Sequence, residues 1–137
     1  MTTEGQKTIK AEDAEAIRKE EVVDIYAALL DKIWQRAIII LGLVTIRAIF
    51  QRAIRSTARD YPLVGDLSVS GGGLNIGDLR ARVGEREKEV IRQGFEGLIL
   101  NLFDLLAELT GQVIVSKLFA QELTVVSDRK KEVSYER

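Results

Sequence analysis

The chain has 137 residues, of which 46% are hydrophobic and 30% are charged, and its formal net charge is −1. This composition is typical of one globular domain, and the balanced charge gives no global attraction to nucleic acid or anionic lipid. The sequence contains no cysteine and no histidine. Disulfide bonds, thiol chemistry, typical zinc sites and imidazole acid–base catalysis are therefore excluded, and we expect no enzyme, no metal site and no cofactor.

Residues 1–10 are polar and show no apolar periodicity, so we expect a flexible N-terminal tail. They lack the apolar core of a signal peptide, which favours a cytoplasmic protein. Residues 11–60 contain no proline and are rich in helix formers, so they are expected to be helical. Their first apolar stripe recurs at spacings of three and four residues and comprises Val22, Ile25 and Leu29.

A second stripe, between residues 39 and 53, steps by four and three residues as a heptad seam does. Its members are Ile39, Leu43, Ile46, Phe50 and Ala53. The two stripes do not share one register, because continuing the first stripe would place Lys32 and Arg36 on the seam. We expect either a kink near residues 31–36 or one long bent helix whose buried face rotates.

The apolar run Ala37–Ile46 has ten residues and lies between Arg36 and Arg47. A helix that spans a membrane needs about 20 apolar residues, and an arginine within the bilayer is costly. The sequence therefore disfavours an integral membrane protein. Peripheral membrane association through the helix around residues 38–50 stays open as an alternative.

The helical region ends at Tyr61-Pro62, because a residue before proline is driven out of the α conformation. In residues 62–84 apolar and polar residues alternate on both sides of Gly71-Gly72-Gly73, which predicts a short β-hairpin or a pair of extended segments. The glycines lack the Lys-Ser/Thr of a phosphate-binding loop, so a turn is favoured over a phosphate site. Asp78 is expected to cap a short helical turn that ends at Gly84.

Residues 85–124 carry the second large helical pattern, with a wide apolar face. One stripe of this face is predicted to form an oligomer seam with the stripe of residues 39–53, and it comprises Leu98, Leu102, Leu105 and Leu109. Asn101 belongs to this candidate seam, where a buried asparagine sets oligomeric state; an outward-facing asparagine would have no such role. Thr110-Gly111 is expected to bend or split the helix, and residues 125–137 to form a flexible C-terminal tail.

Three arginines share one helix face near the end of the first helical region: Arg52, Arg55 and Arg59. Guanidinium groups offer planar forks of donors, so this face is a candidate site for an anion or an acidic partner. The acids available for pairing within the chain are Asp60, Asp66, Asp104 and Glu108. Such pairing is the expectation for a helical protein of balanced charge. Nucleic-acid binding is disfavoured, because the chain has no basic surplus.

Asp104 and Glu108 lie one helical turn apart, where two carboxylates can share a proton or hold a cation. A di-metal site in a helical bundle would need more inward carboxylates and Glu-x-x-His motifs, which the chain lacks. We therefore expect a solvated acidic face or ion pairs with the arginines of residues 33–62.

Together these patterns predict a mainly α fold in one domain, residues 11–124, with long amphipathic helices in a bundle and a hairpin-like insert. The stripes of residues 39–53 and 91–109 are expected to pack antiparallel and to carry more apolar surface than two helices cover, so we predict a homodimer with a four-helix core. The expected function is a non-enzymatic interaction or regulatory module, with a role in signalling, that acts by homo-oligomerisation or by binding a protein partner. The alternatives are binding of a small apolar or anionic ligand between the helices or on the arginine face, and peripheral membrane association.

Overall fold

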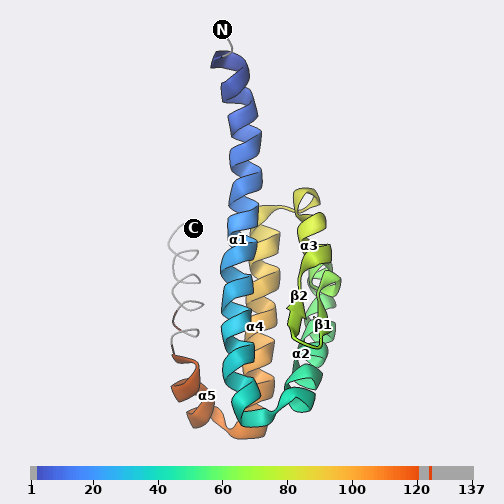
Figure 1. Ribbon diagram of the computed structural model, residues 1–137, viewed down its shortest axis with the longest axis vertical. Helices are drawn as coiled ribbons and strands as arrows, with labels where there is room; N and C mark the ends of the chain where they lie inside the picture. The colour runs from blue at the N-terminus through green and yellow to red at the C-terminus, as the bar shows by residue number, and fades with distance from the viewer. Residues whose placement is uncertain (1–2, 121–123, 125–137) are drawn as a thin grey trace.

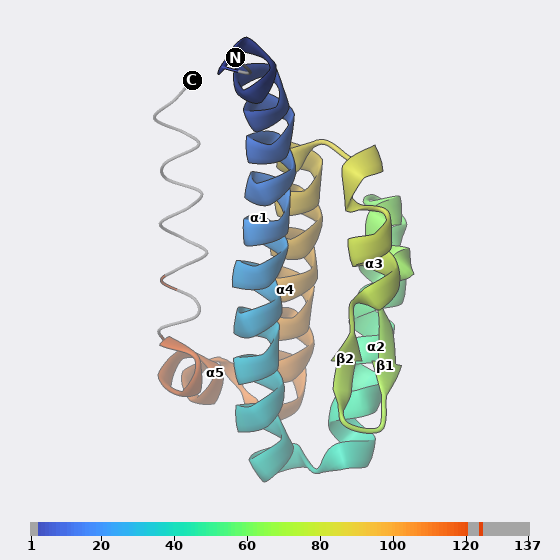
Figure 2. The ribbon, with the colours of Figure 1, turned by 45° about the horizontal axis from the view of Figure 1, so that its top comes forward.

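A computed structural model of the protein describes residues 3–120 and 124, with side chains from Arg18 onward except that of Leu118. Three long helices form the body of the molecule: α1 (Thr3–Leu41), α2 (Leu43–Ala58) and α4 (Lys88–Thr110). In Figure 1 and Figure 2, α1 and α4 run side by side in one direction and α2 runs in the opposite direction. The predicted fold class, a mainly α bundle with a short hairpin insert, is confirmed.

The core of the bundle is made by apolar side chains from the three long helices and from the insert. The ring of Trp34 in α1 packs edge-on against Phe50 in α2, with 5.0 Å between the ring centroids. The ring of Tyr26 in α1 stacks on Phe95 in α4 at 5.4 Å. These contacts join α1 to both neighbours, so the apolar face of each helix is covered by the other two.

Four residues of the predicted oligomer seam lie inside this core: Ile46, Phe50, Leu98 and Leu102. Their helices pack antiparallel, as expected, but they do so within one chain and with α1 as the third helix. These four side chains therefore cannot contact a second copy while the bundle is closed, which corrects that part of the seam. The other members are at least partly accessible: Ile39, Leu43, Leu105, Leu109 and Asn101.

The break in the first helical region falls at Gly42, and α1 is continuous through residues 31–36, where a kink was expected. Gly42 has φ 83° and ψ 164°, a conformation that side chains bearing a Cβ rarely adopt. Its N–H donates to the carbonyl of Ile38, and its carbonyl accepts from the N–H of Ile46. One residue thus closes α1 and opens α2. All members of the second apolar stripe except Ile39 therefore belong to a different helix from the first stripe, which accounts for the change of register.

The N-terminal end of α1 also differs from expectation, because the helix begins at Thr3 rather than after residue 10. At 1.5 Å per residue its 39 residues span about 58 Å, against about 34 Å for the 23 residues of α4. The N-terminal part of α1 accordingly extends beyond the other helices (Figure 1). The C-terminal tail predicted at residues 125–137 lies outside the described residues.

The insert between α2 and α4 contains the predicted hairpin, formed by β1 (Ser68–Ser70) and β2 (Gly73–Asn75). The strands are antiparallel with Val69 opposite Leu74, and Gly71-Gly72 make the turn, as predicted. A 3-10 helix, η1 (Pro62–Asp66), precedes the hairpin. A two-stranded hairpin is marginal alone, so its stability here comes from apolar contacts with α2 and the other core residues.

Two short helices follow the hairpin, α3 (Gly77–Ala81) and η2 (Val83–Glu85). Asp78 does not cap α3, because it lies within the first turn and the side chain of Asn75 accepts the hydrogen bond from the Gly77 N–H at 2.9 Å. An ion pair of 2.6 Å between Arg80 and Asp24 ties this segment to α1. Leu79 and Val83 anchor the two short helices in the core.

The last described helix, α5 (Gln112–Leu118), is separated from α4 by Gly111, so the predicted split is confirmed. Gly111 has φ 92° and ψ 150°, close to the values at Gly42. Its N–H donates to the Ala107 carbonyl and its carbonyl accepts from the Val115 N–H. The molecule therefore turns two corners with the same backbone conformation, and both corners lie at the same end of the bundle (Figure 1).

Candidate interaction surfaces

The end of the bundle that holds the two glycine corners carries an exposed apolar surface, which we call the apolar end surface. Nine large apolar side chains of the described residues are exposed, and seven of them lie here. The seven are Ile39, Ile40, Leu43, Val44, Leu109, Val113 and Ile114. Apolar clusters of this kind on a folded monomer mark contact sites, and sequence patterns placed three of the seven in the candidate seam.

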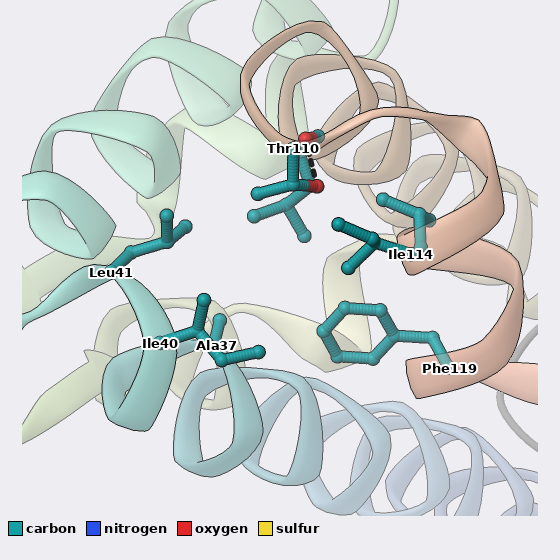
Figure 3. Close-up of a pocket in the computed structure, with 8 residues that line it drawn as sticks. Ala37, Ile40, Leu41, Thr110, Ile114 and Phe119 are labelled. Atoms are coloured by element: carbon teal, nitrogen blue, oxygen red, sulfur yellow. Dashed lines mark hydrogen bonds between the residues drawn. The ribbon is translucent and has the colours of Figure 1, made fainter.

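The inner side of this end is closed by contacts between α1, α4 and α5. Figure 3 shows side chains from the three helices converging on one point, among them Ala37, Thr110 and Phe119. The ring of Phe119 packs against Phe103 of α4, with 5.3 Å between centroids. The cavity left between these side chains measures about 10 Å³, which is close to the volume of one water probe. It offers no room for the apolar ligand considered from the sequence.

Cationic side chains surround the apolar end surface. Arg36 and Arg47 are half-buried and Lys117 is exposed. The Nε atom of Arg47 is buried and has no hydrogen-bond partner among the described residues. Residues 32–59 contain six basic residues and no acid, and residues 109–121 contain only Lys117 as a charge. Both corner segments are therefore basic, although the whole chain is nearly neutral.

The candidate arginines lie along the outer surface of α2. Arg52, Arg55 and Arg59 are all exposed, and none of them forms an ion pair with a described residue. The expected pairing within the chain is therefore wrong for them, and one of the expected partners, Asp66, is engaged elsewhere. It accepts a hydrogen bond from Arg82 at 3.2 Å and lies 3.7 Å from Arg86. The arginine face of α2 is thus available to an anion or acidic partner.

The candidate acids Asp104 and Glu108 lie on α4, next to this arginine face, and both are exposed. An open groove of about 210 Å³ runs between the two helices and is lined by Arg52 and Glu108, with apolar side chains between them. No ion pair joins these acids to an arginine of the described chain, so the solvated acidic face is observed and the predicted ion pairs are not. We call the surface formed by the arginine row and these acids the α2–α4 face.

Asn101 neither points outward nor sits free at a seam. Its amide Nδ2 donates to the hydroxyl of Thr57 at 2.7 Å, and that hydroxyl donates to the Ala53 carbonyl at 2.7 Å. Thr57 is only 2% exposed, so this chain of bonds fixes the height of α4 against α2. Next to it, α4 approaches α2 closely at Gly97, where a Cβ atom would lie 3.3 Å from the Tyr61 ring.

A buried polar cluster joins α1 to α4, and sequence reasoning did not find it. The Tyr26 hydroxyl donates to the carboxylate of Glu96 at 3.0 Å, and Arg92 donates to the same oxygen at 2.6 Å. The side chain of Glu96 is 7% exposed and that of Arg92 is 11% exposed. The signal in the sequence was a glutamate next to Phe95, a member of the apolar stripe that begins at Ile91. The tyrosine that binds this glutamate is 70 residues away.

The same arginine also binds Glu89, one turn earlier in α4. The hydrogen bonds from Arg92 hold the pKa of Glu89 below its usual value. The pKa of Arg92 is raised, mainly by its hydrogen bond to Glu89 and against the effect of burial. Both shifts favour the ionised forms of Glu89 and Arg92. We interpret the cluster as a structural link, because its hydrogen bonds join α1 to α4.

Three further features were considered in the described part of the chain: a metal site, a second groove and a membrane span. Its residues contain no group of three or more carboxylates close enough to hold a metal ion. A second open groove, of about 460 Å³, lies between α2 and the β1 side of the insert, with Arg55 on its wall. None of the described helices is long and apolar enough to cross a bilayer.

Comparisons of the chain with known proteins gave no match. No protein-family model matches it, no curated protein matches it, and no solved structure matches it. Its function must therefore be inferred from its own surfaces.

Proposed function

We propose that this chain is a non-enzymatic interaction module that pairs with a second copy of itself through the α2–α4 face. The separation of charge on this face carries the proposal. Arg52, Arg55 and Arg59 form a basic row on α2, and Asp104 and Glu108 form an acidic row on the neighbouring helix. Neither row is neutralised within the described chain, so each can attract the opposite row of another copy.

The charge pattern selects one geometry of pairing. A two-fold axis parallel to the helices places α2 of one copy opposite α4 of the other at the same height, so the basic row meets the acidic row twice near Arg52. Arg59 lies beyond the acidic row, because Thr57 is level with Asn101. A two-fold axis perpendicular to the helices would place α2 opposite α2 and bring arginines together. The first arrangement produces a four-helix core from two copies of α2 and α4, the kind of assembly expected from the sequence, although with different core residues.

The contact between the rows has an apolar floor. The groove between α2 and α4 is lined in part by Ala48, Ile49, Leu105 and Leu109. Leu109 is 60% exposed, so a second copy can bury much of its side chain. Exposed ion pairs contribute only about 0.2–1 kcal/mol each. We therefore expect charge to set the orientation, and the pair to be reversible and weakened by salt.

The test uses two variants of opposite charge. In the acidic variant, Arg52→Glu is combined with Arg55→Glu, and in the basic variant, Asp104→Arg is combined with Glu108→Arg. Each variant repels itself across both contacts, whereas an equal mixture of the two is complementary across both contacts. Light scattering is expected to give a concentration-dependent mass above 15.3 kDa for the wild type, 15.3 kDa for each variant alone and a restored pair for the mixture.

A matched control changes the net charge by the same amount, but at residues outside the α2–α4 face. Arg18 and Lys32 lie exposed on α1, so Arg18→Glu combined with Lys32→Glu should leave the pairing unchanged. The proposal is refuted if the wild type stays at monomer mass at low salt across all concentrations. It is also refuted if the control dissociates as fully as the acidic variant, or if the mixture stays monomeric while the wild type pairs.

A further inference from the structure

The apolar end surface shares Leu109 with the face proposed for self-pairing, and its other six members lie outside that face. Ile39 is 84% exposed, Val44 is 82% exposed and Val113 is 68% exposed, although each is fully apolar. They belong to the segments that flank Gly42 and Gly111, and these two helix corners lie at one end of an elongated bundle (Figure 1, Figure 2). Residues 37–46 and 109–116 carry no charge at all. A planar apolar phase can therefore receive both corners at once without contacting the sides of the bundle.

Except for Leu109, each exposed apolar residue of this surface has a cation one helical turn away. Arg36 precedes Ile39 and Ile40 by three and four residues, and Arg47 follows Val44 by three residues. Lys117 stands in the same relation to Val113 and Ile114 on α5. When an apolar tip enters the outer part of the acyl-chain region, cations one helical turn away from the tip lie at the level of the lipid headgroups.

We infer that the apolar end surface docks on the surface of an anionic lipid membrane. The cationic rim supplies complementary charge for anionic headgroups, at the depth where long basic side chains favour them. Docking is peripheral, because no described helix can cross a bilayer.

A second copy of this chain is a poorer occupant of the same surface. The two corner segments, residues 32–59 and 109–121, contain basic residues and no acid. End-to-end contact of two bundles would therefore bring cations of one copy against cations of the other, which repel each other. Self-pairing is served better by the α2–α4 face, where both signs are present. Membrane docking and self-pairing share Leu109 but otherwise use different residues, so variants at the other positions can separate the two.

The experiment is flotation of the full chain with vesicles of phosphatidylcholine, with or without phosphatidylserine. We expect the wild type to float with the vesicles that contain phosphatidylserine, and flotation to fall at high salt. Val44→Glu should lower vesicle affinity roughly tenfold or more, because it removes a large apolar contact and adds a repelled charge. Val90→Glu is the matched control, since Val90 is exposed near the opposite end of α4.

The basic rim has its own pair of variants. Lys117→Glu should lower affinity for the anionic vesicles at least roughly fivefold, whereas Lys88→Glu, at the N-terminal end of α4, should not. The inference is overturned if the wild type does not float with either vesicle, or if it floats equally with both. Equal flotation of Val44→Glu and Val90→Glu overturns it as well. A loss of self-pairing by Val44→Glu in light scattering without vesicles would show that a protein contact uses this surface instead.

Discussion

The buried link between Tyr26, Glu96 and Arg92 gives the sharpest prediction on stability. Glu96→Gln removes one charge with almost no change of shape, and it keeps an acceptor for the Tyr26 hydroxyl. Arg92, whose side chain is 11% exposed, loses its buried counter-ion but keeps the exposed Glu89. Removing one partner of a buried pair costs about 3–5 kcal/mol when the other is left alone. With Glu89 still in place, we expect a loss of about 2 kcal/mol.

Two companion variants separate the parts of this link. Tyr26→Phe removes only the hydrogen bond of 3.0 Å to Glu96 and should cost about 1 kcal/mol. Glu85→Gln alters an exposed ion pair with Arg82 at 3.8 Å and should cost less than about 0.5 kcal/mol. Changing all three buried residues together, with Arg92→Met and Glu96→Leu added to Tyr26→Phe, should recover much of the loss, because no buried charge is left unpaired.

The assay is urea unfolding at a fixed low protein concentration, followed by the fluorescence of Trp34. This tryptophan is 2% exposed in the core, so its emission reports the opening of the bundle. If Glu96→Gln unfolds at the same urea concentration as the wild type, the carboxylate does not link α1 to α4 and the reasoning is wrong. A cost equal to that of Glu85→Gln would refute it in the same way.

Two further predictions concern a corner and a hydrogen bond. Gly42→Ala should cost about 1–2 kcal/mol in urea unfolding, because φ there is 83°. Gly72→Ala is the control and should leave the free energy of unfolding nearly unchanged, since φ of Gly72 is not in the left-handed region and nothing lies within 4 Å of the added Cβ. If both variants lose the same free energy of unfolding, the conformation of Gly42 is not the cause. Thr57→Val should lower the free energy of unfolding by about 1 kcal/mol more than Thr110→Val does. Both hydroxyls donate to a carbonyl four residues earlier, but only the Thr57 hydroxyl also accepts a hydrogen bond from Asn101. Thermal unfolding checks this difference, and its absence would mean that the Asn101 contact adds nothing.

Local signals in the sequence determined several elements of this fold. The glycines at 71–73 turn a hairpin and Gly111 separates α4 from α5, as the sequence predicted. The first helical region was predicted to end at Tyr61-Pro62, and α2 ends slightly earlier, at Ala58. Each of these depends on the backbone preference of one or two residues, which acts without regard to the rest of the chain. The helical character of the long segments follows from apolar spacing in the same local way.

The position of the first corner was decided by packing. Gly42 lies within an apolar run, and apolar periodicity does not mark it as a break. The periodicity instead pointed to residues 31–36, where the apolar stripe changes register. The change of register reflects two helices that meet different neighbours, and neighbours are known only once the chain has folded. Asn101 and Thr57 are 44 residues apart, and their hydrogen bond has no counterpart in either local pattern.

The candidate surfaces likewise depend partly on local sequence and partly on packing. The sequence by itself determined that Arg52, Arg55 and Arg59 share a helix face and that residues 32–59 contain no acid. Only the tertiary structure decided that the chain buries Ile46 and Phe50 within itself, leaving other apolar residues at the tip. The physical reason is that periodicity tells which side chains share a face, whereas burial depends on which face another part of the chain covers.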